Sequence, residues 1–406
     1  MMATQIQEGK DRPLVQTVDM LSESQQKAIR KIAAHDEARI PTLDETRPVS
    51  IFTGQERFDA EQRDIFQKRA VPLTVSARLK PGTAVAHDSY GKALIITRDK
   101  AGEAHVFLNA CMHKGAKLID DPNRVKGERS SDGCPVQAMG RMTCPYHAWS
   151  YGLNGKLLAA ARPETFANLD KSTRGLKELA CKDAGGLIWS MLDPDAEPDF
   201  SSLDDQMVED MEAFELGDLH VYGHKTFHLN SNWKLVLEPF LEGYHVQRLH
   251  VNSVGALFAD VPNVTNFLGD NLRQTSGKLQ FDPADVDIPG ENIHKTVTHA
   301  YNLFPNCVVV TSPYYISIMI LQPNAPDRTV VDYFMLTRGA ADNPKAKELY
   351  KKSYDMVLNV FGNEDFWASE ISQEGLSSGA LQDVIYSGME ESIIFYYENL
   401  EKYLSN

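Results

Sequence analysis

Two cysteines and two histidines stand in a spacing that could build one metal site. They occur as Cys-x-His at Cys111 and His113, then, after thirty intervening residues, as Cys-x-x-His at Cys144 and His147. Two thiolates with two imidazoles suit either a tetrahedral zinc ion or a [2Fe–2S] cluster held between two loops. A proline, several aromatic residues and a Gly-Leu-Asn-Gly turn surround the second pair. Such shielding from water favours the iron–sulfur interpretation.

A second set of possible ligands lies further along, within a helix predicted over residues 233–250. Glu242 and His245 are three apart and share a helix face, whereas His250 is five residues beyond His245. Five residues turn an ideal helix by roughly 500°, so both histidines reach one metal only if the helix bends, bulges or ends between them. Two imidazoles and a carboxylate form the facial triad of Fe(II) oxygenases. Asp365 is the candidate for the carboxylate.

Both patterns resemble those of the alpha, or oxygenase, subunits of Rieske non-haem iron aromatic-ring-hydroxylating oxygenases. The Rieske signature, Cys-x-His-Lys/Arg-Gly followed by Cys-Pro-Tyr-His-x-Trp, is matched at residues 111–115 and 144–149. The catalytic-domain pattern, Asn-Trp-Lys, an acid, Tyr-His and a His five residues later, is matched within residues 232–250. The late Glu-Asp and Gln-x-Gly-Leu segments are matched within residues 364–376. The chain is thereby identified as a member of this family.

The resemblance implies a role for each matched residue. One iron of the cluster would be bound by Cys111 and Cys144, and the other by His113 and His147. Mononuclear Fe(II) would be bound by His245, His250 and Asp365, with Glu364 as the close alternative to Asp365. Two residues that are not ligands, Asn232 and Glu242, are expected to be catalytic. Glu242 would link His245 of one subunit to His147 of the next, in a homotrimer closed head to tail.

The gap between the two cluster motifs is about twice the family's usual length. We expect the extra residues to form a surface loop, which costs little loop entropy, and Cys134 within it to be a bystander rather than a ligand. Residues 111–165 carry eight Lys or Arg and five Asp or Glu. Six of these basic residues could receive an acidic ferredoxin or reductase, or could form a solvated loop: Lys114, Lys117, Arg124, Lys126, Arg129 and Arg141.

Composition excludes several classes of protein. A net charge of −15 over 406 residues opposes binding to nucleic acid. No run approaches the roughly 18 apolar residues of a membrane span, and no secretory signal is recognisable, so a cytoplasmic location is expected. Five cysteines are too few and odd in number for a disulfide framework. No nucleotide or flavin fingerprint stands out, so the reductase must be a separate chain.

The predicted fold is α+β, in three parts. Residues 1–49 form an N-terminal helical arm, with a helix near residues 21–38. Residues 50–165 form a small antiparallel β Rieske domain, because short β-branched runs alternate with Gly and Pro turns. Residues 166–406 form a larger, helix-grip-like catalytic domain with an antiparallel sheet. Its predicted elements are helices at 344–361 and 382–404 and long strands within 299–324 and 329–339.

The predicted function is the terminal oxygenase of a multicomponent system, using O₂ and electrons from NAD(P)H through a ferredoxin or reductase. The expected substrate is an aromatic or otherwise apolar small molecule, hydroxylated by monooxygenation that can end in N- or O-dealkylation. The alternatives are a ring cis-dihydroxylating dioxygenase, a zinc-dependent hydrolase and an electron-transfer iron–sulfur protein. Eight apolar residues could line the substrate pocket or belong to the core: Leu249, Phe258, Phe267, Val308, Val310, Tyr314, Ile316 and Ile318.

Overall fold

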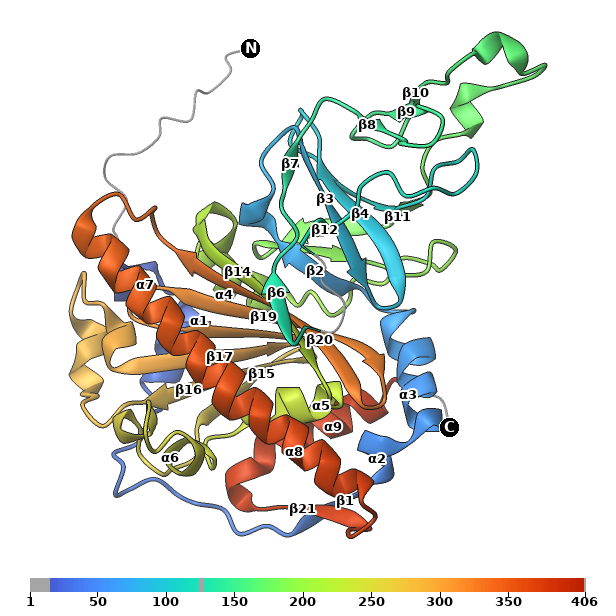
Figure 1. The fold of residues 1–406 in the computed structure, drawn as a ribbon. Helices are drawn as coiled ribbons and strands as arrows, with labels where there is room; N and C mark the ends of the chain where they lie inside the picture. The colour runs from blue at the N-terminus through green and yellow to red at the C-terminus, as the bar shows by residue number, and fades with distance from the viewer. Residues whose placement is uncertain (1–14, 124–127, 405–406) are drawn as a thin grey trace.

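The computed structural model describes residues 15–123 and 128–404. Figure 1 shows a β unit at the top and a larger unit below it, in which a broad sheet carries helices on its faces. This is the predicted α+β architecture with antiparallel sheets. No helix within the described residues is long and apolar enough to cross a membrane.

The β unit contains the strands that the alternating runs predicted. It comprises β2 (Val71–Val75), β3 (Thr83–Ser89), β4 (Lys92–Arg98), β5 (Ala104–Leu108), β7 (Gln137–Ala138), β8 (Met142–Thr143), β9 (Ser150–Tyr151), β10 (Leu157–Ala159), β11 (Glu178–Leu179), β12 (Cys181–Ala184) and β13 (Leu187–Ser190). They form sheets in the orders β11-β5-β4-β3-β7, β12-β13-β2 and β10-β9-β8. Tyr90 and Gly91, with φ of 50° and 72°, make the two-residue turn between β3 and β4. Residues 178–190 join these sheets, although they follow the boundary expected at 165.

The larger unit is built on an eight-stranded antiparallel sheet. Its order is β15-β16-β17-β18-β19-β20-β14-β6. The strands are β6 (Ser130–Asp132), β14 (His220–Leu229), β15 (Val264–Leu268), β16 (Asn271–Gly277), β17 (Val297–Leu303), β18 (Cys307–Thr311), β19 (Ile316–Ala325) and β20 (Arg328–Thr337). The helices are α4 (Asp205–Ala213), α5 (Trp233–Leu237), α6 (Val246–Leu249), α7 (Pro344–Asn359), α8 (Phe366–Ser377) and α9 (Glu391–Glu401). Helices α7 and α8, orange to red, cross the near face of the sheet (Figure 1).

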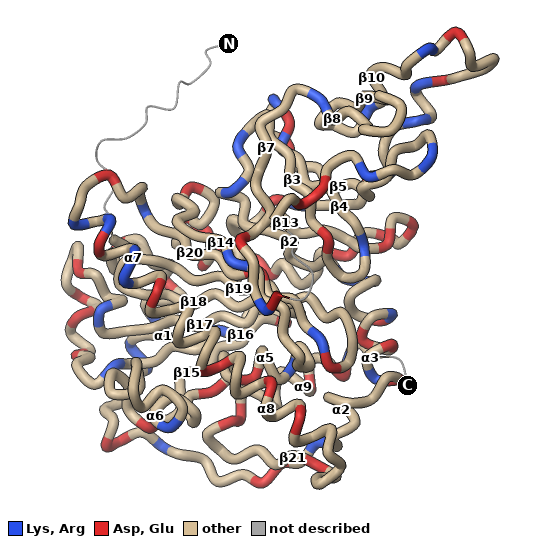
Figure 2. The backbone as a smooth tube through the Cα atoms, in the orientation of Figure 1, with Lys and Arg blue, Asp and Glu red and all other residues tan. Residues whose placement is uncertain are grey.

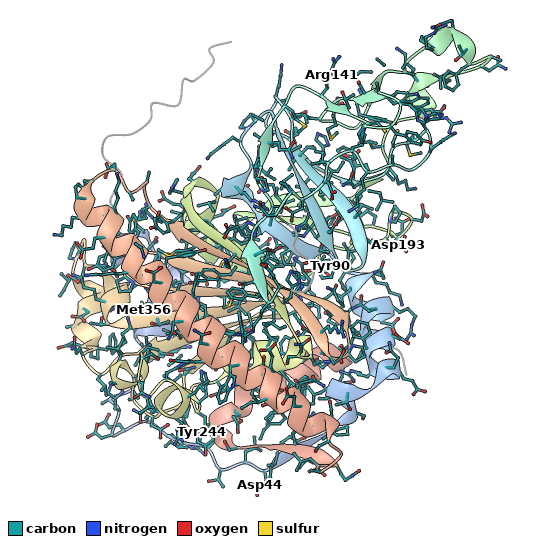
Figure 3. The ribbon with its side chains drawn as sticks, viewed as in Figure 1. Asp44, Tyr90, Arg141, Asp193, Tyr244 and Met356 are labelled. Carbon is teal, nitrogen blue, oxygen red and sulfur yellow. The ribbon has the colours of Figure 1, made fainter. Side chains whose placement is uncertain are left out.

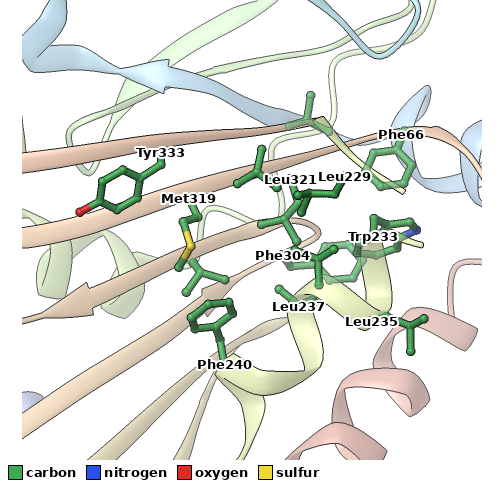
Figure 4. Close-up of a cluster of buried hydrophobic side chains, with 14 of the residues drawn as sticks. Phe66, Leu229, Trp233, Leu235, Leu237, Phe240, Phe304, Met319, Leu321 and Tyr333 are labelled. Carbon is green, nitrogen blue, oxygen red and sulfur yellow. The ribbon is translucent and has the colours of Figure 1, made fainter. Parts of the chain in front are cut away.

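The central strands are apolar on both faces because both faces are covered. On β19, Ile318 and Ile320 belong to the core beneath α1 (Glu23–Ile29) and α4, while Met319 and Leu321 belong to the opposite core. Side chains alternate along a strand, so a continuous apolar run such as Ile-Met-Ile-Leu, residues 318–321, supplies both layers. Figure 4 shows Met319 next to Phe240, with Leu321 between Met319 and Trp233, the first residue of α5.

The two chain termini differ from the predicted long helices. Helix α1 begins with a capping box, Ser22 with Gln25, and ends at Ile29 instead of near 38. The residues after it lie against the end of β16, where the His35 ring is 3.3 Å from the Lys278 carbonyl. Residues 382–404 are also not one helix. Strand β21 (Asp383–Tyr386) pairs with β1 (Glu45–Pro48), and α9 follows.

Two short helices tie the start of the β unit to the larger unit. They are α2 (Ser50–Thr53) and α3 (Gln55–Glu61). Glu61 is fully buried and accepts hydrogen bonds from Lys234 Nζ at 2.8 and 2.9 Å and from Trp233 Nε1 at 2.9 Å. An unpaired charge would be costly at this depth, so the Glu61–Lys234 pair fixes how α3 sits on α5.

The long gap between the cluster motifs is more than the expected surface loop. Residues 130–132 form β6, which pairs with residues 225–227 of β14 as the last strand of the large sheet. Gly133 allows this close approach, because a Cβ there would overlap the His224 ring. The open edge of β14 provides unpaired backbone groups, which explains why a polar segment becomes a strand. Arg124 and Lys126 lie outside the described residues.

Candidate metal centres and active-site cavity

The four predicted cluster residues come together at the end of the β unit. Cys111 follows β5, and Cys144 and His147 lie in the loop between β8 and β9. Both cysteines are free thiols, 3% exposed, and the rings of His113 and His147 are 4.6 Å apart between centroids. His113 Nδ1 is buried without a hydrogen-bond partner among the described residues. Two buried thiols and two close imidazoles, carried on two loops, fit a [2Fe–2S] cluster with two Cys and two His ligands.

Aromatic residues shield this group. Trp149 stacks on His113 with ring centroids 4.9 Å apart, and Tyr151 Oη lies 3.3 Å from Cys111 Sγ. The same Tyr151 hydroxyl accepts a hydrogen bond from the Met112 amide at 3.0 Å. Hydrogen bonds and shielding around the sulfurs help set the potential of such a cluster.

The predicted helix over 233–250 is interrupted where its ligand spacing required a break. Helix α5 ends at Leu237, and a 3-10 turn containing Pro239 follows, because a proline cannot donate the next helical hydrogen bond. Glu242 is extended, with φ −148° and ψ 171°, and α6 then begins beyond His245. The break lets His245 and His250, at the two ends of α6, turn toward a common point.

Asp365 joins the two histidines. Its Oδ1 lies 3.6 Å from His245 Nε2 and 3.1 Å from His250 Nε2, and one ligand atom from each of the three residues lies within 4.8 Å of the others. Asp365 ends a π-helix, Val360–Asp365, inserted between α7 and α8. Such π-bulges occur often at functional sites. Two imidazoles and one carboxylate, with Asp365 and His250 at 2% and 3% exposure, fit a mononuclear iron site.

Two glutamates hold the outer nitrogens of the histidine rings. Glu242 Oε1 lies 2.6 Å from His245 Nδ1, and Glu364 Oε2 lies 2.5 Å from His250 Nδ1. A hydrogen bond at Nδ1 fixes the tautomer that leaves Nε2 free to bind a metal. Glu364 therefore supports His250 in this structure, and Asp365, rather than Glu364, faces both Nε2 atoms.

Asn232 lies at the N-terminal end of α5. Its side chain caps α5 by accepting from the Lys234 amide at 3.0 Å, and it donates to the carbonyls of Phe52 and Pro326 at 3.0 and 2.7 Å. It is 1% exposed and does not line the cavity described below. Asn232 therefore positions the helix that leads to the metal site, which differs from the catalytic role expected for it.

A cavity of about 300 Å³ opens beside the metal-site residues. Glu242, His245, His250 and Asp365 line it, together with apolar side chains that include Phe240, Val246 and Phe361. Of the eight apolar residues considered from the sequence, Phe258 and Val310 line this cavity. Val308, Ile316 and Ile318 are core residues, and Phe267 is 57% exposed.

Residues of the N-terminal arm also line the cavity, which the sequence did not suggest. They are Lys31, Ile32, Ala33, His35, Ala38 and Arg39. A mostly polar segment without a regular pattern carries no local sign of its destination, so only the folded chain brings it to the site.

The extra segment between the cluster motifs also reaches the metal site. Arg129 Nη2 donates to the Gly362 carbonyl at 3.2 Å and to Glu370 Oε2 at 2.6 Å, and Glu370 also accepts from the Asn230 amide at 3.0 Å. Gly362 belongs to the π-helix that ends at Asp365. The segment therefore connects the two cluster loops to the helix that positions Asp365. Burial raises the pKa of the Cys134 thiol in this segment to about 12, so the thiol stays protonated.

Some of the basic residues considered for binding the electron-transfer partner form ion pairs within the chain. Lys117 pairs with Asp88 at 2.7 Å, and Arg129 pairs with Glu370. Lys114 and Arg141 are exposed. Basic and acidic positions alternate along the β unit in Figure 2, so a single basic face is not evident there.

Two family profiles match the chain. The Rieske [2Fe-2S] domain matches residues 69–170, and the catalytic domain of the ring hydroxylating alpha subunit matches residues 216–406. The chain belongs to the Rieske oxygenase alpha subunits. This alpha subunit is thus an O₂-dependent oxidoreductase, the terminal oxygenase of its system, with a Rieske [2Fe–2S] cluster and a mononuclear iron. Its electrons come from a reductase or ferredoxin.

Individual relatives agree with this assignment. The alpha subunit is 24% identical to the carnitine monooxygenase oxygenase subunit of Escherichia coli K12, over 87% of this chain and 92% of that one. It is 32% identical to the anthranilate 1,2-dioxygenase large subunit of Acinetobacter baylyi, over 51% of this chain and 43% of that one.

Solved structures share the fold. A quaternary ammonium Rieske monooxygenase in complex with L-carnitine superimposes with a TM-score of 0.71 at 21% identity, covering 89% and 96% of the two chains. Naphthalene 1,2-dioxygenase from Rhodococcus sp., bound to indole, gives 0.69 at 19% identity, covering 94% and 98%.

Proposed function

We propose that this alpha subunit inserts one oxygen atom of O₂ into a small organic molecule held in the cavity beside His245, His250 and Asp365. The observation that carries the proposal is that these three residues converge on one point and line a cavity of about 300 Å³. The overall reaction would convert a C–H bond, O₂, two electrons and two protons into a hydroxyl group and water. Hydroxylation at a carbon next to nitrogen or oxygen would give a hemiaminal or hemiacetal, whose C–N or C–O bond would then break to release that carbon as an aldehyde while the hydroxyl proton passes to the nitrogen or oxygen. The relative aligned over nearly its whole length is a monooxygenase subunit.

The chain's own residues would prepare the site for this reaction. Bound iron would supply O₂ activation, since the metal carries the redox chemistry and the protein supplies position and electrostatics. Glu242 and Glu364 would hold the two imidazoles with Nε2 toward the iron. Phe240, Phe258 and Phe361 would hold the apolar part of the substrate and limit water near the reacting carbon.

We further propose a homotrimer closed head to tail, in which electrons cross between subunits. In Figure 3, Arg141 and Tyr244 lie on opposite sides of the subunit. Arg141 is three residues before Cys144, and Tyr244 is adjacent to His245. Tyr146 and Tyr244, which flank the two centres, are 63% and 41% exposed. Exposed aromatic residues are frequent in interfaces. A ring would bring Tyr146 of one subunit to Tyr244 of the next and place Glu242 between His147 and His245.

Mixed trimers would test this arrangement. Cys144→Ser should remove the cluster, Asp365→Ala should remove the mononuclear iron, and each variant alone should be inactive. A random one-to-one mixture co-assembled in cells should recover roughly a quarter of the native rate, because half of the subunits keep a cluster and half of those face a subunit that keeps its iron site. Persistent inactivity of assembled mixtures would refute transfer between subunits.

Oxygen labelling would test the reaction type. Turnover under ¹⁸O₂ with a surrogate reductase should give products that carry one labelled atom. Two labelled atoms on adjacent ring carbons would instead support ring cis-dihydroxylation, which the partial similarity to anthranilate 1,2-dioxygenase makes the second candidate.

A further inference from the structure

The mouth of the active-site cavity is formed partly by the N-terminal arm. After α1 the chain crosses the end of β16, where Gly277 makes room for Ile32, since a Cβ at Gly277 would lie 2.9 Å from Ile32 Cγ2. The His35 ring contacts the Lys278 carbonyl there. Lys31 and Arg39 are exposed, whereas Asp365 and His250 are almost fully buried. The arm therefore lies at the outer end of the cavity and the metal-site residues lie at its inner end.

The charges that line the cavity are segregated along its depth. The outer end carries two cationic side chains, Lys31 and Arg39, which we call the arm cations. Neither Lys31 nor Arg39 forms an ion pair with another residue in the described part of the chain. The acidic side chains among the described lining residues are Glu242 and Asp365, at the inner end.

Both of those acids face the histidines of the metal site. Glu242 accepts hydrogen bonds from the His245 amide and ring, and Asp365 faces both Nε2 atoms. No described lining residue therefore offers a free carboxylate to a cationic substrate group, whereas the mouth offers free cations to an anionic one.

We propose that the arm cations bind the carboxylate of a small anionic substrate, and that the apolar side chains deeper in the cavity receive the rest of its body. This inference rests on the proposed function of the same cavity. Arginine and lysine bind carboxylates through charge-assisted hydrogen bonds, and the segregated lining orients the substrate with its apolar end toward the metal-site residues. The arm is thereby a specificity element of the active site.

Two kinds of carboxylate would satisfy this lining, and the test separates them. The body could be an aromatic ring, stacked among Phe240, Phe258 and Phe361, or a quaternary ammonium group in contact with the faces of the same rings. Benzoate and trimethylammonioacetate are the two carboxylate probes. Benzamide and tetramethylammonium are their counterparts without a carboxylate.

The experiment measures probe binding to the cluster- and iron-loaded oxygenase by calorimetry under argon, and probe-stimulated O₂ consumption with a surrogate reductase. At least one carboxylate should bind more tightly than its counterpart. The double variant Lys31→Gln/Arg39→Gln should weaken that binding about tenfold or more, because charge-assisted hydrogen bonds are lost. Binding of the counterpart should not change. Lys27→Gln is the matched control, since Lys27 is an exposed lysine of α1 that does not line the cavity.

Each other outcome counts against one specific idea. Equal binding of carboxylates and counterparts, no detectable binding of either carboxylate, or an unaltered affinity in the double variant would overturn the arm-cation proposal. Carboxylate binding that depends on the arm cations but never stimulates O₂ consumption would instead overturn the proposed oxygenase role of the cavity. Calorimetry with His245→Ala separates these two failures. This variant lacks a metal-site residue but keeps the arm intact, so its carboxylate binding tests the arm-cation proposal without depending on turnover.

Discussion

Glu364 provides the sharpest test of how this metal site is built. Its Oε2 lies 2.5 Å from His250 Nδ1 and also accepts from Ser253 Oγ at 2.7 Å. The hydrogen bond fixes the ring so that Nε2 faces Asp365. Removing such a partner of a metal-binding histidine typically lowers metal affinity by about 10- to 100-fold, which corresponds to about 1.4–2.8 kcal/mol. We therefore expect Glu364→Ala to bind Fe(II) 10- to 100-fold more weakly, and Glu364→Gln, which keeps an acceptor oxygen, to lose roughly tenfold or less.

The assay is an anaerobic Fe(II) titration against a competing chelator, after mild chelation has emptied the mononuclear site. The visible absorbance of the Rieske cluster should stay constant and reports that the β unit is intact. Glu374→Ala is the control, because Glu374 is an exposed glutamate of α8, the helix that directly follows the π-helix containing Glu364. If Glu364→Ala removed iron as completely as Asp365→Ala, Glu364 would be a ligand. A native affinity would show that the hydrogen bond does not contribute.

Three further predictions concern the elements around this site. Arg129→Gln should remove the contacts to Gly362 and Glu370, which are worth about 1 kcal/mol for an exposed pair. Amide hydrogen exchange should then become faster in residues 360–365 and stay the same in the β unit. Unchanged exchange in residues 360–365 would show that Arg129 does not hold the π-helix. Lys234→Met should lower the free energy of unfolding by about 3 kcal/mol. This is the lower end of the range for breaking a buried ion pair, because Arg57 still pairs with Glu61 at 2.7 Å. A thermal unfolding midpoint equal to that of the native protein would contradict this prediction. Burial raises the pKa of Glu238 from its ordinary 4.5 to about 7, against hydrogen bonds from two tyrosines. The folded state keeps this proton to higher pH than the unfolded state does, so the stability it contributes is present below pH 4.5 and is lost as the pH rises to 7. Glu238→Gln should flatten that decline, which is at most about 3 kcal/mol, and an identical pH profile would refute the assignment.

Local sequence patterns identified most of the regular elements, for a physical reason. The strands β2 to β5 and β17 to β20 alternate or are apolar throughout according to whether one or both faces are buried, and that pattern is visible without the fold. The predicted helix over 344–361 appears as α7 and the π-helix that follows it. The ligand motifs were equally local, because Cys111 and His113, or Cys144 and His147, sit on one loop each.

Other features depended on partners distant in the sequence. The breaks after Leu237 and at Glu242 follow from Pro239 and from the convergence of His245 and His250 with Asp365, more than a hundred residues away. The choice between Glu364 and Asp365 depended on how a π-helix turned two adjacent carboxylates, one to each side of His250. Neither a helical pattern nor a motif contains that rotation.

The sequence by itself predicted the two sets of candidate ligands and determined the α+β class, because ligand type, short spacing and hydrophobic period are properties of neighbouring residues. Tertiary structure decided the rest. It made the polar segment with Arg129 a strand on the open edge of β14, and it brought Lys31 and Arg39 of the arm to the mouth of the cavity. Polar segments of this kind take their conformation from the surfaces that they cover, so their roles appear only when those surfaces exist.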